Sequence, residues 1–209
     1  MIRLYAADTR QLNGRFDELY PRLSLERRQR INALKSNADK LRCIAAGLLL
    51  DTVFKKRAKT DIVYNPYGKP ALSGGPCFNI SHAGDYAVLA VSGKEVGVDI
   101  ERWRKADTVA LAKRFYHPHE QAALFAASDP VECFFTIWSL KESYIKAIGR
   151  GFAVAPSSFA VLPDESDGAS FLGNGNFHFK RYFDFQGYAL SICALEAVFP
   201  DAVTVLSYE

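Results

Sequence analysis

The chain has 209 residues, of which 49% are hydrophobic and 23% charged, proportions of a globular protein rather than a disordered or fibrous one. Its 26 Lys and Arg against 23 Asp and Glu give a net charge of +3, too small to indicate nucleic-acid binding. No apolar run reaches the roughly 18 residues of a membrane span, no secretion signal is evident, and the four cysteines form no CxxC pair. We therefore expect a cytoplasmic protein with reduced cysteines that binds neither nucleic acid nor membranes.

The N-terminal part of the chain predicts a strand, two helices and then several strands. A strand is expected at residues 2–7, and Ser24 is a suitable N-cap for a basic helix over residues 24–34. Apolar residues repeat at helical spacing over residues 39–56, which predicts a long core helix. Further strands are expected at residues 61–64, 77–81, 86–91 and 96–101. Short connectors between the last three favour an antiparallel meander.

The C-terminal part repeats this order. Helices are expected at residues 107–115, 118–127 and 130–148, and strands at residues 159–162, 177–183, 188–194 and 202–206. A polar, mobile loop is expected at residues 163–175. We predict an α+β (α/β) fold of two similar halves in a pseudo-twofold arrangement, each an antiparallel sheet packed on a long helix. The expected domains are residues 1–100 and 101–209, with the functional site in the cleft between them.

The helix predicted over residues 130–148 carries charges beside large apolar side chains. A spacing of three or four residues places one set of side chains on a single stripe of this helix: Trp138, Lys141, Glu142, Ile145 and Lys146. A charge is costly to bury without a partner, so the stripe should line either solvent or a site. The simpler interpretation is an ordinary surface pair between Glu142 and Lys146.

Two carboxylates share one face of the strand predicted at residues 96–101. Alternation along VGVDIE sends the valines and the isoleucine to one face and Asp99 and Glu101 to the other. The face could simply contact solvent, but neighbouring like charges repel and acidic residues are poor strand formers. A divalent cation would relieve both problems. With Glu142 added, three carboxylates form a candidate oxygen site for Mg²⁺ that leaves positions for water and a substrate phosphate.

Cations are placed near the same segments. Lys69 lies on a turn rich in Pro and Gly, His82 follows the strand at residues 77–81, and Lys141 and Lys146 lie on the helix. Carboxylates, a metal and several cations are the groups needed to bind and activate a polyphosphate. Neither a P-loop nor a dinucleotide-binding glycine motif is present. The residues by themselves predict a Mg²⁺-dependent enzyme acting on a phosphate ester or anhydride.

Four ordered blocks resemble the 4′-phosphopantetheinyl transferases. They are YGKP at residues 67–70, FNISH at 78–82, VGVDIE at 96–101 and WSLKESYIK at 138–146. The chain length is similar to that of the larger, surfactin-type class, in which two like halves form a pseudodimer. The resemblance implies transfer of the 4′-phosphopantetheine arm of coenzyme A to a serine of an apo acyl or peptidyl carrier protein. It also implies adenosine 3′,5′-bisphosphate as the second product and Mg²⁺, with Mn²⁺ as an alternative, as the ion.

The resemblance further implies roles for single residues. Asp99, Glu101 and Glu142 match acidic residues that hold Mg²⁺ against the pyrophosphate of coenzyme A, and Lys146 matches the lysine on that pyrophosphate. Five other positions match nucleotide contacts: Arg42 near the 3′-phosphate, Lys69 and Pro70 around the adenine nucleotide, and Ser81 and His82 at its phosphates. The family's basic residues before the long helix cannot be assigned singly to Arg27, Arg28 or Arg30.

The expected mechanism and partner follow from this assignment. Glu142 is the candidate general base, acting directly or through a water, while Lys146 stabilises charge on the pyrophosphate and Lys141 assists. Carrier proteins are typically acidic, so Arg102 and Arg104 are expected to form a basic docking surface. An internal cleft predicts a monomer. The alternatives are a non-catalytic module that binds coenzyme A or a carrier protein, and a Mg²⁺-dependent hydrolase of nucleotide anhydrides.

Overall fold

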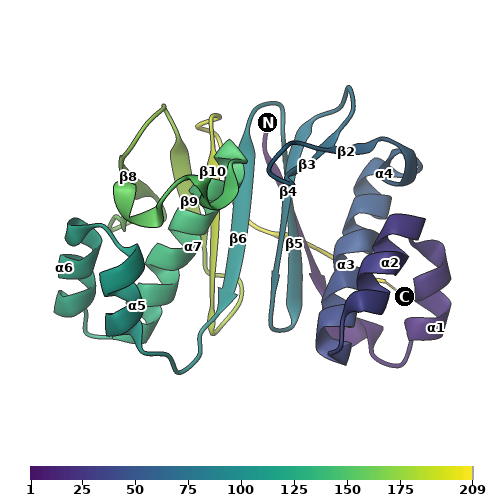
Figure 1. Cartoon of the computed structure of the whole chain (residues 1–209), viewed down its shortest axis with the longest axis horizontal. Coiled ribbons are helices and arrows are strands. Elements are labelled where there is room, and N and C mark those ends of the chain that lie inside the picture. Colours follow the sequence, from purple (N-terminus) through teal and green to yellow (C-terminus); the bar gives the residue numbers. More distant parts are fainter. Residues whose placement is uncertain (209) are drawn as a thin grey trace.

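A computed structural model of the chain describes residues 1–208 (Figure 1). The N-terminal helical elements are η1 (Thr9–Leu12), α1 (Phe16–Leu19), η2 (Tyr20–Arg22), α2 (Leu25–Ala33), α3 (Asn37–Phe54) and α4 (Arg57–Thr60). The first strands are β1 (Arg3–Asp8), β2 (Ile62–Tyr64), β3 (Pro70–Leu72), β4 (Cys77–Ala83), β5 (Tyr86–Ser92) and β6 (Val96–Arg102). The later helical elements are α5 (Thr108–Phe115), α6 (Pro118–Ala126), α7 (Pro130–Ile148), η3 (Gly151–Ala153) and η4 (Pro156–Ser158). The later strands are β7 (Ala160–Pro163), β8 (Ala169–Leu172), β9 (His178–Tyr182), β10 (Tyr188–Ala194) and β11 (Thr204–Leu206).

The strands form two main sheets and two small hairpins. The first sheet has the order β11–β1–β5–β4, in which only the β1–β11 pair is parallel. The second has the antiparallel order β6–β10–β9. β2 pairs with β3, and β7 with β8. The predicted α+β fold, with largely antiparallel sheets that each pack on a long helix, is confirmed.

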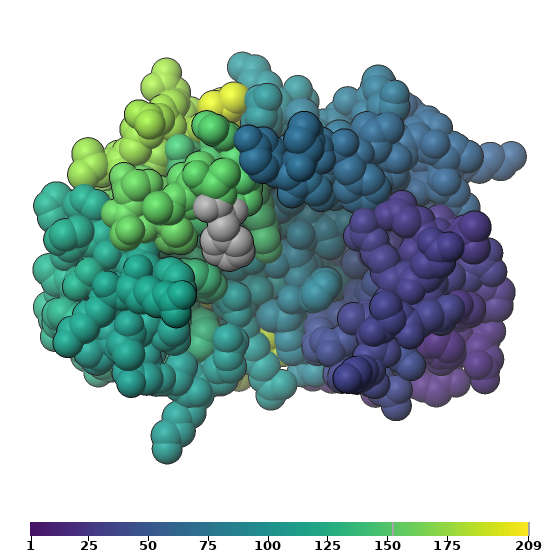
Figure 2. Space-filling model, in the orientation of Figure 1, coloured from purple at the N-terminus to yellow at the C-terminus, as the bar shows by residue number. Residues whose placement is uncertain are grey.

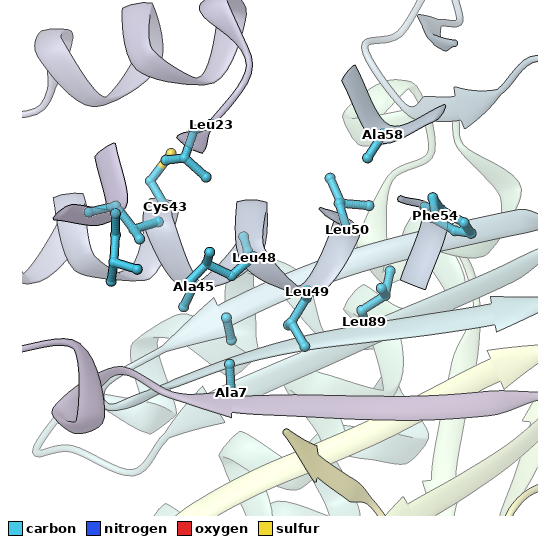
Figure 3. Packing of buried hydrophobic residues seen from close by; sticks show 14 of the residues in the cluster. Ala7, Leu23, Cys43, Ala45, Leu48, Leu49, Leu50, Phe54, Ala58 and Leu89 are labelled. Atoms are coloured by element: carbon cyan, nitrogen blue, oxygen red, sulfur yellow. The ribbon is translucent and has the colours of Figure 1, made fainter. Parts of the chain in front are cut away.

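The two sheets lie face to face between two layers of helices. Helix α3 covers the outer face of the first sheet, where Leu49 packs near Ala7 and Leu89 (Figure 3). The inner faces of the two sheets share a second apolar cluster, and α7 covers the outer face of the second sheet through a third one. Figure 1 shows the resulting order, with α7 to the left of β6 and α3 to the right of β5. None of the helices in residues 1–208 has the length and apolar character that crossing a bilayer requires.

The predicted meander of three strands was wrong at its third strand. β5 pairs with β1 on one edge and with β4 on the other, so neither edge is free for β6. β6 pairs instead with β10, and the Val98 N–H donates to Asn79 Oδ1 of β4 at 2.9 Å. Residue 100 therefore lies within a strand of the second sheet, while β11 returns to the first sheet. The division into residues 1–100 and 101–209 stays a prediction.

The predicted loop at residues 163–175 was also wrong in part, since it contains β8. This strand pairs with β7, and the Arg181 guanidinium holds the preceding turn by donating to the Asp164 carbonyl oxygen at 2.8 Å. Glycine, serine and aspartate on either side obscure so short a strand in the sequence. A distant arginine is what organises the segment.

Candidate active site

A cavity of about 710 Å³ is lined by residues between Leu23 and Glu101 and by two residues of α7, Glu142 and Lys146. One wall comes from α2, α3, α4 and the strands β2 to β4, and the other from β6 and α7. Figure 2 shows a hollow on this face between the purple N-terminal helices and the green C-terminal segment. The structure brings most of the predicted site residues to this cavity: Pro70, Ser81, His82, Asp99, Glu101, Glu142 and Lys146.

Local sequence signals build helix α7, which carries two of these side chains. Asp129 caps its start by accepting from the Val131 and Glu132 amides at 2.9 and 3.0 Å, and Pro130 occupies the first turn. Gly149 ends the helix in the left-handed conformation, with φ of 64°. The helix is thereby held between two defined ends.

Strand β6 approaches α7 at a glycine. A Cβ atom on Gly97 would lie 2.0 Å from the Ser143 carbonyl oxygen, so only glycine allows this contact. The strand's valines and isoleucine enter the core between the sheets, as alternation predicts. Asp99 and Glu101 therefore project toward the cavity beside Glu142.

Asp99 is the centre of a buried polar network. Its Oδ1 atom accepts from Lys146 Nζ at 2.5 Å and from Ser81 Oγ at 2.9 Å, and Lys146 Nζ also donates to Ser81 Oγ at 2.9 Å. The other oxygen, Oδ2, is buried and has no hydrogen-bond partner among the described residues. A buried carboxylate oxygen without a partner is costly, and it is available to a ligand.

The carboxylates repel one another. Desolvation, followed by repulsion from Asp99, raises the pKa of Glu142 from 4.5 to about 7, against an opposing attraction from Lys146. Desolvation and Asp99 likewise raise the pKa of Glu101. A strongly raised pKa in a cleft is typical of functional carboxylates. A proton or cation that binds to these carboxylates reduces the repulsion between them and so stabilises the cluster.

The donor set fits a hard divalent cation, although it is not assembled as a ready coordination shell. Three carboxylates and an unpartnered buried oxygen are suitable groups for Mg²⁺. Within residues 1–208, however, no three Asp, Glu, His or Cys side chains are already grouped as metal ligands. Lys146 and Ser81 occupy the Oδ1 atom of Asp99 instead.

The helical wall of the cavity carries charges of both signs. Arg27 and Arg30 from α2 and Lys59 from α4 line it, but Arg30 pairs with Glu26 at 2.8 Å and Lys59 with Asp51 at 3.6 Å, and both of these carboxylates line the same cavity. The sequence showed α2 as a basic helix but could not assign a role to any one of its arginines. Gly47 could have indicated the position of Arg27 in the sequence analysis. A Cβ at Gly47 would lie 2.7 Å from Arg27 Cδ, so the glycine in α3 leaves room for the Arg27 side chain to pack against that helix.

His82 lies exposed at the cavity surface. Desolvation by the surrounding protein, with repulsion from Arg42 and Lys146, lowers the pKa of its imidazole below 6.5.

Two predicted nucleotide contacts point elsewhere. Arg42 donates to the Gly84 carbonyl oxygen at 2.9 Å and pairs with Asp39, and it does not line the large cavity. Lys69 donates to the backbone oxygens of Ala147 and Val96 at 2.7 and 3.1 Å. It lines a smaller cavity of about 230 Å³, which Glu142 and Lys146 also line.

Lys141 was wrongly expected beside Glu142 in the cavity. Its side chain is fully buried, and its Nζ lies 2.7 Å from both carboxylate oxygens of Glu120 and 2.8 Å from the Phe159 carbonyl oxygen. At ~100° per residue, Lys141 lies about 140° around the helix from Lys146. The two lysines are at opposite edges of a stripe too wide to face one cavity.

Comparisons with known proteins identify the family of this chain. Residues 95–193 match the model of the 4′-phosphopantetheinyl transferase superfamily. The chain is 33% identical over 208 residues to a 4′-phosphopantetheinyl transferase of Bacillus subtilis, covering 94% of this chain and 92% of that protein. It is 30% identical to 4′-phosphopantetheinyl transferase Sfp of Bacillus subtilis strain 168, covering 90% and 88%. The chain belongs to the 4′-phosphopantetheinyl transferase family.

A solved structure is also similar to this transferase. It is the holo-[acyl-carrier-protein] synthase of Thermotoga maritima, with a TM-score of 0.42 and 20% identity, covering 51% of this chain and 66% of that one. The family match to residues 95–193 includes β6, α7 and β10, the elements that carry or support the carboxylates. The resemblance inferred from four short blocks is therefore confirmed.

Lys141 and Glu120 of this transferase should behave as a structural pair. Lys141→Met leaves the Glu120 carboxylate buried without its cation, so the free energy of unfolding should fall by about 3–5 kcal/mol. Adding Glu120→Gln removes that charge and should recover at least ~1 kcal/mol. Urea denaturation of both variants measures the effect. Equal stability of Lys141→Met and the parent protein would contradict a structural role.

Proposed function

We propose that this chain transfers the 4′-phosphopantetheine arm of coenzyme A to a serine of an apo acyl or peptidyl carrier protein, with Mg²⁺ as the assisting ion. The serine oxygen forms a new bond to the β-phosphorus, the pyrophosphate bond breaks, and adenosine 3′,5′-bisphosphate leaves. The observation that carries this proposal is a cavity in which Asp99, with one buried oxygen that has no hydrogen-bond partner among the described residues, lies with Glu101, Glu142 and the cation Lys146.

The cavity suits a nucleotide with several phosphates. Its volume of about 710 Å³ is within the usual range for small-molecule sites. Arg27, and Arg30 and Lys59 once they release Glu26 and Asp51, would offer positive charge for a terminal phosphate. Lys146 contacts Asp99, where a pyrophosphate would meet a metal, and His82 lines the same cavity. This arrangement supports coenzyme A as the co-substrate.

We propose Asp99, Glu101 and Glu142 as the residues that hold Mg²⁺. The ion, when bound, would neutralise phosphate charge and align the pyrophosphate for displacement. Lys146 must loosen from Asp99 Oδ1 for its ammonium to reach a phosphate oxygen. Its attraction to the carboxylates would then be replaced by attraction to the substrate.

Glu142 is the proposed general base. The pKa of about 7 belongs to the metal-free protein, and a bound Mg²⁺ would lower it by stabilising the ionised carboxylate. In the proposed reaction the serine hydroxyl gives its proton to Glu142, directly or through a water, as the oxygen attacks phosphorus. Lys146 stabilises the negative charge that develops on the leaving phosphate.

The reaction class is tested by the intact mass of an apo carrier protein after incubation with this chain, coenzyme A and Mg²⁺. We expect a gain of one phosphopantetheine, lost when EDTA is added. Coenzyme A binding without a gain in mass on acyl or peptidyl carriers would support a binding module. Release of adenosine 3′,5′-bisphosphate in the absence of any carrier would support a hydrolase.

Glu142→Gln should separate catalysis from folding. Loss of a general base should lower transfer by at least about 100-fold. Because the folded pKa of about 7 exceeds 4.5, the parent protein should lose stability as pH rises through that interval, whereas the glutamine variant should not. Without metal or coenzyme A, the variant's Tm should exceed the parent's by at least ~2 °C at pH 8, and by less at pH 5. Parent-like turnover would exclude Glu142 from the mechanism.

Arg102 and Arg104 are proposed to meet an acidic carrier protein. Both are exposed and directly follow Glu101, and Arg104 lies 3.3 Å from Glu101 Oε2. Reversing both charges with Arg102→Glu and Arg104→Glu should raise the carrier KM about tenfold and leave the coenzyme A KM unchanged. Arg102→Glu alone avoids the contact with Glu101, and Lys94→Glu, at the other end of β6, is the matched control. Steady-state kinetics that show an unchanged carrier KM would refute this docking surface.

A further inference from the structure

The turn at residues 65–69 reaches across from the N-terminal half to the end of helix α7. Asn65 Nδ2 donates to the Gly149 carbonyl oxygen at 2.7 Å, and Lys69 Nζ donates to the Ala147 carbonyl oxygen at 2.7 Å. The last carbonyls of a helix have no partner within it and form the negative end of its dipole. Two side chains of one turn therefore cap a helix more than 75 residues later in the chain.

Asn65 also organises the turn itself. Its Oδ1 atom accepts from the backbone amides of Tyr67 and Lys69, both at 2.9 Å. The backbone N–H of Asn65 donates to the Lys69 carbonyl oxygen at 3.0 Å. One end of this side chain holds the turn closed, and the other end binds the helix. The turn therefore reaches α7 in a single defined conformation.

Gly149 makes the contact close. A Cβ on Gly149 would lie 2.6 Å from Lys69 Cδ and 3.2 Å from Asn65 Nδ2, in addition to the unfavourable φ of +64° for any other residue. The glycine that ends α7 thus also admits the turn. The sequence explained this glycine only as the end of a helix.

Lys69 joins the turn to a third element. Besides Ala147, its Nζ donates to the Val96 carbonyl oxygen at the start of β6, 3.1 Å away. Desolvation lowers the pKa of this lysine, and no carboxylate forms an ion pair with it in the part of the chain described here. The ammonium is used on backbone carbonyls rather than directed into the large cavity.

We propose that Asn65 and Lys69 are positioning residues, a latch that fixes the catalytic end of α7 relative to β6. The latch binds Ala147, the neighbour of Lys146, and Val96, three residues before Asp99. It therefore adds a side-chain tie to the direct backbone contact at Gly97, and holds the end of the helix that carries Glu142 and Lys146 in place on the strand that carries the other carboxylates. This inference rests on the proposed function, and it replaces the predicted contact of Lys69 with the nucleotide.

Two variants remove the latch without adding a charge near the expected position of the coenzyme A phosphates. Asn65→Ser keeps an oxygen that can accept from the turn amides but is too short to donate to Gly149. Lys69→Met keeps the apolar stem and removes both donations to carbonyl oxygens. Lys94→Met, on an exposed lysine outside the site, is the matched control.

Hydrogen exchange and kinetics give the deciding readouts. In both latch variants, backbone amides of residues 145–149 should exchange at least about fivefold faster. kcat should fall about tenfold while the Kd for coenzyme A, measured by calorimetry, changes less than about threefold. The control should match the parent protein in all three measurements.

The opposite pattern overturns the inference. A Kd for coenzyme A that weakens about tenfold in Lys69→Met, with unchanged exchange at residues 145–149, would assign Lys69 to the nucleotide instead. Unchanged exchange and unchanged kcat in both variants would reject the latch outright. Hydrogen exchange and coenzyme A binding can be measured without transfer to a carrier protein. These two measurements therefore test the latch even if the proposed reaction fails in the parent protein.

Discussion

The contact between the backbones of β6 and α7 is the constraint on which the site depends. It exists because Gly97 has no side chain: a Cβ there would lie 2.0 Å from the Ser143 carbonyl oxygen. With strand and helix this close, Asp99 and Glu142 must share one small space, and burial makes their repulsion strong. Any larger residue at position 97 would separate the two elements and with them the carboxylates.

Helix α7 uses two adjacent charged residues in opposite ways. Lys141 is satisfied by Glu120 and by the Phe159 carbonyl oxygen, so this buried charge connects the helix to α6 and to the residue that precedes β7. Burial, followed by repulsion from Asp99, raises the pKa of Glu142, the next residue, to about 7. A satisfied buried pair is consistent with a structural role, whereas a carboxylate with a raised pKa is stabilised when a proton or a cation binds to it.

The sequence by itself determined the local features of this protein. Helix limits followed from caps and periodicity, as at Ser24, whose side chain accepts from the Arg27 amide, and at Gly149. Alternation along β6 placed Asp99 and Glu101 on one face, and the short blocks around them were sufficient to indicate the family. These features depend on neighbours within about four residues, which is why they can be read without the fold.

Only the tertiary structure decided where charged side chains finally point. β6 joined β10 because both edges of β5 were already paired, and nothing in the hairpin-length connector indicates this. The sequence around Lys141 and Lys69 does not indicate their partners. Lys141 pairs with Glu120, and Lys69 donates to a backbone carbonyl oxygen at the end of a distant helix. A long side chain can reach partners in several directions, and its direction is chosen by the groups that become buried around it. Those groups come from distant parts of the chain, so no local pattern determines them.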